Sequence, residues 1–520
     1  MPGTVETYLP PPLAEASGSH RVRVLGREVF VERHGGVSYA RFGMRGPASV
    51  EIEVAASIGS WVVFPEERVL SAAVSGSVLT VQLASPESVV VWIDQLEKLF
   101  LLPDPPEDNA PDPGSPGMLQ VTDFGADPTG SRLATHELQA AIDSATLRPG
   151  GGTVILPRGV FRTGTLTLRS NVTLYLARGA LLLGSRDPSD YPIDPGRHES
   201  GPDARLPADV RYLGRTMTFS RLLLVDRAHD VQICGRGTID GEGTFLRTQR
   251  NAVPNLLRVH ESHRVSVRDV LFRNSAAWSL HVLSCRDVDL RNVKILNDRA
   301  NLNTDGIDID MSSNVTIERS FIHTKDDAIC VKATRNGDLS GDVAGVHATG
   351  NLVSSLDAAL KLGTESEAGS FTDVAFEDNF VFDSGRAMSV VVRDGATYRR
   401  VAFRRIHVGP NVDHLVEQVI GVRDPEAALG AIRDLTFEDV TAPTFTRPAG
   451  NWTWYAQFRP GRPGPEALVN VFEGADETHA VDGLTLRRFV VNGQHLGDAA
   501  TAASVANLTV GPHVRNVTFE

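Results

Sequence analysis

The chain has 520 residues, of which 41% are hydrophobic, and a formal net charge of −13 at pH 7. This length allows two domains and a large core, and the excess of acidic groups argues against nucleic acid as a partner. No stretch is long and apolar enough to cross a membrane. The first residues lack a signal-peptide pattern, which predicts a cytoplasmic location, or a secreted protein if a leader was removed.

Short strands with period-two alternation fill residues 20 to about 102, with Gly and Ser between them. This pattern is typical of a small antiparallel β-sandwich. A segment rich in Pro and Asp follows, and such a composition cannot form regular structure. We therefore predict a β-sandwich over 1–102, a linker over 103–118 and a second domain over 119–520.

One helix is expected at the start of the second domain. Apolar residues recur at helical spacing in the segment 135–145, at Leu138, Ala141, Ile142 and Ala145. Thr135 precedes them as the expected N-cap. A single helix before a long run of strands would cover the open end of a solenoid.

A repeated strand phrase dominates the chain from about residue 150. Its starts at Val265, Val288 and Val315 are separated by 23 residues (265 to 288) and 27 residues (288 to 315). Gaps this short leave no room for crossover helices, so the pattern predicts an all-β fold with a parallel β-helix. The last repeat reaches Glu520 inside a strand. Either the chain was trimmed or another surface covers that edge, which makes a homo-oligomer one expectation.

The cysteines Cys234, Cys285 and Cys330 lie far apart, each in an apolar strand-like run. An odd number at such spacing predicts buried, reduced thiols and no disulfide framework.

Two acidic clusters lie almost one repeat apart. Asp305 in Asn303-Thr304-Asp305-Gly306 precedes the Asp326-Asp327 pair by 21 residues (305 to 326). Stacked strands lie about 4.8 Å apart, so three carboxylates would converge on one face. Crowded carboxylates cannot all ionise, and the proton they retain can serve glycosidic hydrolysis.

Other interpretations of these acids remain open. Asp and Asn also form turns by bonding to their own backbone, and clustered carboxylates also suit calcium. Asp308 and Asp310 alternate with apolar residues and are expected to face solvent or to form turns.

The two clusters together resemble glycoside hydrolase family 28, the polygalacturonases. Segments 121–126, 237–243 and 274–281 resemble the same family, so the similarity extends over about 120 to 440. The resemblance implies a right-handed parallel β-helix and an inverting hydrolase that needs no metal or organic cofactor. By position, Asp326 would be the general acid, and Asp305 and Asp327 would hold and activate the water.

The chain departs from the family pattern where the family contacts its substrate. Residues 357–359 (Asp-Ala-Ala) stand where the family usually has Gly-His-Gly, and residues 387–393 lack its Arg-Ile-Lys. Lys361 or Arg393 would then grip the substrate carboxylate. The end of the sandwich, residues 99–106, resembles the dextranase and isopullulanase family, whose substrates are neutral glucans. A pectic galacturonide is favoured, and a neutral glycan is the alternative.

Further substrate-binding residues are expected around the acids: Asn303, Glu365, Trp278 and His281. Trp452, Trp454 and Tyr455 concentrate aromatic rings that could stack on sugars. The long loops 186–221 and 411–433 could close one end of a groove, which favours exo action on an oligosaccharide or polysaccharide. Two other functions remain: a β-helix polysaccharide lyase using calcium and a Lys or Arg base, and a non-catalytic carbohydrate-binding solenoid.

Overall fold

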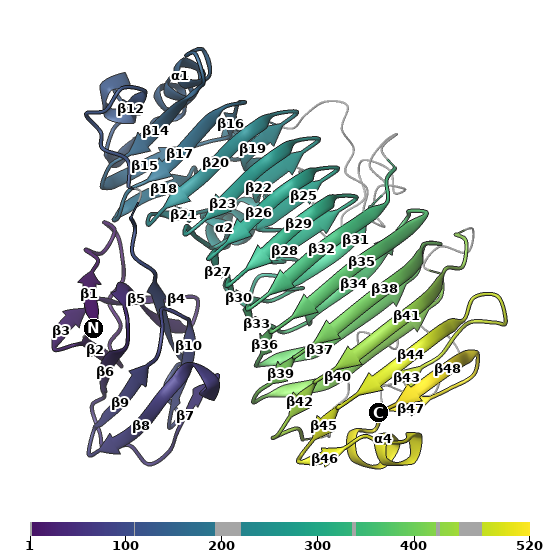
Figure 1. The fold of residues 1–520 in the computed structure, drawn as a ribbon. Helices are drawn as coiled ribbons and strands as arrows, with labels where there is room; N and C mark the ends of the chain where they lie inside the picture. Colours follow the sequence, from purple (N-terminus) through teal and green to yellow (C-terminus); the bar gives the residue numbers. More distant parts are fainter. Residues whose placement is uncertain (1–2, 109, 193–219, 335–339, 423–426, 447–470) are drawn as a thin grey trace.

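The computed structural model describes residues 3–108, 110–192, 220–334, 340–422, 427–446 and 471–520. Figure 1 shows a small β unit at the N-terminus lying against a long solenoid. Within the described residues, no helix has the length and apolarity that a membrane crossing requires.

The N-terminal unit is the predicted β-sandwich, built from two sheets. The first sheet contains β1 (Thr4–Thr7), β4 (Val31–His34), β5 (Val37–Arg45), β7 (Trp61–Phe64), β10 (Val89–Ile93) and β11 (Leu99–Asp104). The second contains β2 (Arg21–Val24), β3 (Arg27–Val29), β6 (Ala48–Glu53), β8 (Val69–Ser75) and β9 (Val78–Leu83). The alternating apolar side chains of both sheets meet in one core. Strand β11 continues to Asp104, two residues beyond the predicted end of the sandwich.

The second unit is a right-handed parallel β-helix with three sheets, which confirms the predicted fold class. Sheet I contains β12 (Met118–Gln120), β14 (Gly152–Leu156), β17 (Val172–Leu176), β20 (His229–Gly235), β23 (His263–Arg268), β26 (Arg286–Arg291), β29 (Ser313–Glu318), β32 (Val343–Thr349), β35 (Ser370–Glu377), β38 (Thr397–Arg404), β41 (Ala431–Glu438), β44 (Val481–Arg487) and β48 (Val514–Phe519).

Sheets II and III complete each coil. Sheet II contains β13 (Thr129–Leu133), β15 (Gly159–Thr163), β18 (Ala180–Gly184), β21 (Thr238–Asp240), β24 (Leu271–Arg273), β27 (Lys294–Leu296), β30 (Phe321–Thr324), β33 (Leu352–Ser355), β36 (Phe380–Val381), β39 (His407–Val408), β42 (Thr441–Ala442), β45 (Val490–Val491) and β46 (Gln494–His495). Sheet III contains β16 (Leu166–Leu168), β19 (Arg221–Asp226), β22 (Asn255–His260), β25 (Leu280–Leu283), β28 (Ile307–Asp310), β31 (Ile329–Ala333), β34 (Ala358–Ser366), β37 (Ser384–Val392) and β40 (Val412–Ile420).

The repeated phrase of the sequence is the strand of sheet I. Val265 pairs with Val288, and Val288 pairs with Val315, each one coil further along. All three side chains are buried in the solenoid core. A stack of this kind removes apolar surface from water on every coil, which fixes the register along the solenoid.

Helix α1 (Thr135–Thr146) covers the first coils, and Figure 1 shows it at that end of the solenoid. Its predicted apolar face is buried, as expected from the helical spacing. The predicted N-cap is wrong, since the N-cap residue is Ala134 and no side chain caps the helix. Thr135 lies inside the first turn, where its Oγ1 accepts a hydrogen bond of 2.8 Å from the Gly164 N–H. Shorter helices are α2 (Gly243–Phe245) and α4 (Ala499–Ala506).

The sandwich packs against sheet II. Phe100 of β11 contacts Phe321 of β30, with ring centroids 4.8 Å apart, in an apolar cluster that contains residues of both units. Next to this cluster, Arg273 of β24 forms an ion pair with Glu32 of β4. The two units therefore share buried contacts, both apolar and charged.

The cysteine prediction is confirmed, because Cys234, Cys285 and Cys330 are all buried and unpaired. Burial raises the pKa of the Cys285 thiol to about 12, so this group stays protonated at neutral pH.

Candidate functional site

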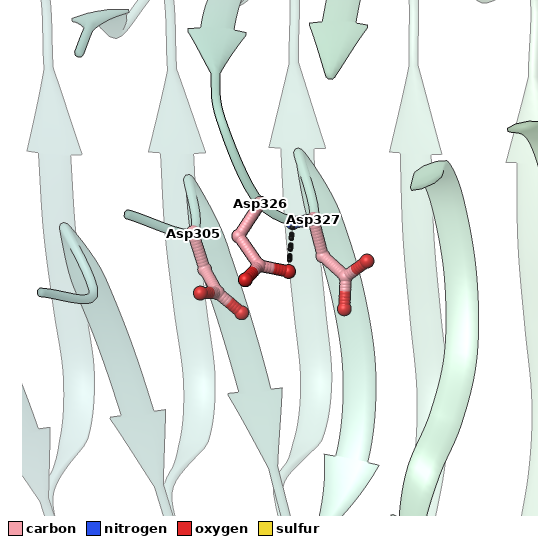
Figure 2. A group of neighbouring side chains, drawn as sticks. All are labelled: Asp305, Asp326 and Asp327. Atoms are coloured by element: carbon pink, nitrogen blue, oxygen red, sulfur yellow. Dashed lines mark hydrogen bonds between the residues drawn. The ribbon is translucent and has the colours of Figure 1, made fainter. Parts of the chain in front are cut away.

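The two acidic clusters lie in the turns that lead from sheet II to sheet III. Asp305 precedes β28, and the Asp326-Asp327 pair precedes β31 in the next coil. Ile307 pairs with Ile329, 22 residues further along (307 to 329), so the 21-residue spacing of Asp305 and Asp326 is one residue short of a full coil and places them on adjacent coils. One carboxylate oxygen from each of the three acids lies within 4.8 Å of the other two. Figure 2 shows the three side chains next to one another on adjacent coils.

Backbone contacts bring the two turns close together. The Gly306 N–H donates a hydrogen bond of 2.8 Å to the Asp327 carbonyl. A Cβ at position 306 would lie 2.4 Å from the Ala328 carbonyl oxygen and 2.6 Å from Ile322 Cγ2. Glycine is therefore required here by the close approach of two coils.

Asp326 is fixed mainly through its backbone. Its carbonyl accepts hydrogen bonds of 2.6 Å from the Thr324 hydroxyl and 2.7 Å from the Ser355 hydroxyl. Its carboxylate accepts a hydrogen bond of 3.0 Å from the Asp327 N–H, drawn as the dashed line in Figure 2.

The expectation that Asp308 and Asp310 face solvent is wrong, because both are fully buried. They do point away from the apolar core, as strand alternation requires, but other polar side chains cover that face. Asp308 pairs with Lys332 at 2.7 Å, and Asp310 accepts a hydrogen bond of 2.5 Å from the Thr334 hydroxyl. These partners offset part of the cost of burial, but burial still raises the pKa of both groups to about 7.

Lys332 was not identified from the sequence, although it lies at the centre of the site. Its ammonium lies 3.5 Å from Asp305 Oδ2 and 3.9 Å from Glu365 Oε2. It also lies 4.0 Å from the centroid of the Trp278 ring, a cation–π contact. The signal was present in the sequence, since a lysine in an apolar strand one coil after Asp308 and Asp310 shares their face.

The structure brings Lys361 to the acids as well. Its ammonium donates a hydrogen bond of 2.7 Å to Asp327 Oδ2. The predicted role of Lys361 was to grip a substrate carboxylate. In this structure it contacts a carboxylate of the protein.

The other predicted binding residues are distributed around this centre. His281 is buried, 4.9 Å from Trp278 by ring centroids, and its Nε2 lies 3.0 Å from Asp310 Oδ2. Asn303 is half-buried and lies two residues before Asp305. Arg393 follows β37, and its backbone N–H donates a hydrogen bond of 3.0 Å to the Ser366 hydroxyl. Trp452, Trp454 and Tyr455 lie outside the described residues.

Several carboxyl groups of the site have raised pKa values. Burial raises the pKa of Asp305 well above its ordinary value, and the charges of Asp308 and Asp326 add to this. Burial and the charge of Asp327 also raise the pKa of Asp326, and burial raises that of Asp308 to about 7 despite Lys332. Among the described residues, Oδ1 of Asp305 and Oδ1 of Asp327 are buried without a hydrogen-bond partner. Such a cluster can donate a proton, hold a water molecule or bind a cation.

Comparison with known proteins gives related sequences for the segment that carries these acids. Residues 214–356 match the family model of glycosyl hydrolases family 28. A probable polygalacturonase of Vitis vinifera is 30% identical over 280 residues, covering 51% of this chain and 55% of that protein. An exo-poly-alpha-D-galacturonosidase of Dickeya chrysanthemi is 26% identical over 320 residues, covering 51% and 50%. The chain thus spans about half the length of these relatives.

Solved structures show the same fold. An exopolygalacturonase from Thermotoga maritima superposes with a TM-score of 0.57 at 18% identity, covering 78% of this chain and 92% of that one. A family 28 exopolygalacturonase from Yersinia enterocolitica superposes with a TM-score of 0.53 at 18% identity, covering 90% and 96%. The resemblance to glycosyl hydrolases family 28 indicated by the motifs is thereby confirmed for the segment of the β-helix that contains Asp305, Asp326 and Asp327.

Proposed function

We propose that this protein is an inverting glycoside hydrolase that acts on a pectic galacturonide, as an oligosaccharide or polysaccharide. The observation that carries the proposal is the convergence of three carboxylates within 4.8 Å, on adjacent coils of a β-helix. The match of residues 214–356 to glycosyl hydrolases family 28 supports it.

Each acid has a role in this proposal. Asp326 donates its proton to the glycosidic oxygen as the bond to the anomeric carbon breaks. Asp305 and Asp327 hold a water molecule, which attacks that carbon and gives up one proton to them. The hemiacetal product then has the opposite anomeric configuration. Solvent then restores the proton to Asp326 and takes up the proton that Asp305 and Asp327 received.

The stereochemical outcome is itself a test. Inverting enzymes usually separate their two carboxyl groups by roughly 6.5–9.5 Å, and retaining enzymes by about 5–5.5 Å. The 4.8 Å limit in this structure joins one chosen oxygen of each carboxylate, so it is a different quantity from the carboxyl separation in that rule. The inverting mechanism proposed here rests on the resemblance to the family. Proton NMR of the first product should show the inverted anomer, and a retained anomer would refute single displacement.

The substrate class is inferred from the relatives. The matched proteins of Vitis vinifera and Dickeya chrysanthemi carry names that refer to polygalacturonan. The chain lacks the Arg-Ile-Lys pattern of the family, and Lys361 is already paired with Asp327. A neutral glycan therefore remains the second candidate. Product analysis over a panel of acidic and neutral oligosaccharides distinguishes the two, and the length of the first product separates exo from endo action.

Replacement of the proposed acid tests the reaction class. Asp326→Asn should reduce turnover by about 10²- to 10⁴-fold, the usual contribution of a general acid, without changing the unfolding midpoint by more than a small amount. Asp373→Asn, which removes an exposed partner of Arg400, is the matched control and should leave the rate unchanged. A near-normal rate for Asp326→Asn would refute the assignment of Asp326 as the general acid.

A polysaccharide lyase is the alternative that the geometry allows, because the same three carboxylates could hold a cation. A lyase would produce an unsaturated sugar that absorbs ultraviolet light, and a chelator would abolish its activity. The hydrolase should produce no such absorbance and keep its rate in the presence of a chelator.

A further inference from the structure

The turn that carries Asp305 is long compared with the turn that follows it. It comprises residues 297–306, between β27 and β28, whereas the corresponding turn of the next coil has only residues 325–328. All residues of the longer turn are described, and none of them belongs to a helix or strand. The position of Asp305 therefore depends on the other contacts that this turn makes.

Hydrogen bonds within the turn couple its two ends. Asn297, at its start, donates a hydrogen bond of 3.2 Å from Nδ2 to the Thr304 carbonyl. The Thr304 hydroxyl donates one of 2.9 Å to the Asn301 carbonyl, and the Asn301 N–H donates one of 3.0 Å to the Asp298 carbonyl. Asp305 follows Thr304 directly. A displacement near Asp298 is therefore transmitted to Asp305.

Arg299 ties the turn to coils further along the solenoid. Its guanidinium donates a hydrogen bond of 2.6 Å to Asp383 Oδ2 and one of 3.2 Å to the Asp383 carbonyl, and it also binds the Ser354 hydroxyl. Ser354 lies in β33 and Asp383 follows β36, two and three coils beyond β27 in sheet II. This contact therefore holds the turn across the coil that carries Asp326 and Asp327.

Lys98 of the sandwich binds the same carboxylate. Its Nζ donates a hydrogen bond of 2.5 Å to Asp383 Oδ2, the oxygen that Arg299 also binds. The side chains of Lys98 and Asp383 are 26% and 14% exposed, so solvent screens this ion pair only in part. Asp383 thus lies between a cation of the sandwich and a cation of the turn, and Lys98 helps to fix the carboxylate that Arg299 needs.

A glycine of the sandwich touches the same turn directly. Gly35 and Gly36 form the link between β4 and β5, and both are left-handed, at φ +54° and φ +82°. A Cβ at position 35 would lie 3.2 Å from Asp298 Cα, whereas a Cβ at position 36 would have no atom within 4 Å. The sandwich therefore contacts the turn at two adjacent residues, Asp298 through packing and Arg299 through charge.

We propose that the sandwich takes part in catalysis by positioning Asp305. Lys98 and Gly35 are positioning residues that hold the turn of residues 297–306 from outside its own coil, and Lys98 acts through Arg299. The inference rests on the proposed function, because that function assigns Asp305 to holding the attacking water.

Loosening the turn should lower kcat and leave KM nearly unchanged. A misplacement of about 1 Å can slow catalysis about 10²-fold, and the loss of one restraint among several should displace Asp305 by less, so Lys98→Met should lower kcat about tenfold. KM should stay within about twofold, since no contact with the substrate is removed. Lys98→Arg keeps the cation and should restore kcat.

A double variant tests the route of the effect. Arg299→Met should lower kcat at least as far as Lys98→Met does. If Lys98 acts through Arg299, adding Lys98→Met to Arg299→Met should lower kcat no further, because the effects of residues in one network are not additive. A further loss as large as that of Lys98→Met alone would overturn the proposal.

Two controls separate positioning from lost stability. Arg41→Met removes another cation at the contact between the units, where Arg41 pairs with Asp104 at 2.8 Å and donates a hydrogen bond to the Arg236 carbonyl. It should lower the unfolding midpoint and leave kcat unchanged. Gly36→Ala introduces a left-handed alanine into the same link as Gly35→Ala, but without the contact. Gly35→Ala should lower kcat, and Gly36→Ala should not.

The kinetic outcome is decisive in either direction. The proposal is overturned if Lys98→Met or Gly35→Ala keeps the wild-type kcat, or if either control lowers kcat as far.

Hydrogen exchange measures the restraint without any activity. The amides of residues 297–306 should exchange about fivefold faster in Lys98→Met, as expected for the loss of a partly exposed ion pair, and faster also in Gly35→Ala. They should exchange at the wild-type rate in Arg41→Met and Gly36→Ala. Unchanged exchange in Lys98→Met refutes the restraint even in an active enzyme. Faster exchange, with a wild type that cleaves neither acidic nor neutral oligosaccharides, would instead refute the hydrolase.

Discussion

The buried charge network between the sandwich and sheet II gives a quantitative prediction. Arg273 donates hydrogen bonds of 2.6 Å to Asp240 Oδ2 and 3.0 Å to the Tyr39 hydroxyl, and it also binds Glu32. The side chains of Arg273, Glu32 and Asp240 are 6%, 6% and 8% exposed. Arg273→Met keeps the apolar volume but leaves two carboxylates buried without their cation. Breaking a buried ion pair in this way costs about 3–5 kcal/mol.

The cost should depend on pH. Burial raises the pKa of Asp240, but Arg273 and His34 outweigh burial and hold that pKa below its ordinary value. In the wild type, this carboxylate therefore contributes stability that is present above its unfolded pKa of about 3.9 and lost as pH falls through the folded pKa. Without Arg273 burial prevails, so ionised Asp240 is destabilising at pH 7, and its protonation at lower pH relieves this.

Urea unfolding followed by tryptophan fluorescence at pH 7 and pH 4.5 measures this difference. Arg400→Met, which removes an exposed partner of Asp373, is the control and should unfold like the wild type at both pH values. The reasoning would be refuted if Arg273→Met lowered the free energy of unfolding by less than about 1 kcal/mol at pH 7, or by the same amount at both pH values. Adding Asp240→Asn and Glu32→Gln to Arg273→Met should recover part of the lost stability.

Two further predictions concern packing. Gly306→Ala places a Cβ against the Ala328 carbonyl oxygen and Ile322, so it should displace Asp305 and lower kcat/KM about 10²-fold. The control Gly18→Ala, where no atom lies within 4 Å of the new Cβ, should leave kcat/KM unchanged. Equal kcat/KM values for the two variants would contradict the argument. Phe100→Ala removes a ring buried between the two units and should cost about 3–5 kcal/mol in urea unfolding; a loss below about 1 kcal/mol would show that the apolar contact contributes little.

The sequence was sufficient to predict features that repeat or that depend on spacing. The β-helix followed from apolar positions that recur every coil, and the convergence of Asp305 with the Asp326-Asp327 pair followed from a spacing close to that repeat. Features that depend on what covers a strand were not predictable. The alternation of apolar and polar residues correctly predicted that Asp308 points away from the core. It did not show how far the Lys332 side chain covers Asp308. The helix start was misplaced for a similar reason, since Thr135 bonds to the distant Gly164.

The stacking of the coils fixes the positions of the acids. Stacking of coils sets the distance between Asp305 and the next turn, because strands pair at about 4.8 Å wherever the sheet is regular. The turn that carries Asp305 is also restrained by contacts outside its own coil. Arg299, six residues earlier, donates a hydrogen bond of 2.6 Å to Asp383, and Lys98 of the sandwich donates one of 2.5 Å to the same carboxylate.

The contact between Lys98 and Asp383 links the sandwich to the turn that carries Asp305. The turn runs from β27 of sheet II to β28 of sheet III, and a shift of about 1 Å in it would misplace Asp305 enough to slow catalysis. Lys98, Asp383 and Arg299 come from three separate segments, one of them in the sandwich, so movement of the turn would break two partly buried ion pairs. Coil stacking thus places the three carboxylates together, and the contact with the sandwich restrains the turn that carries Asp305.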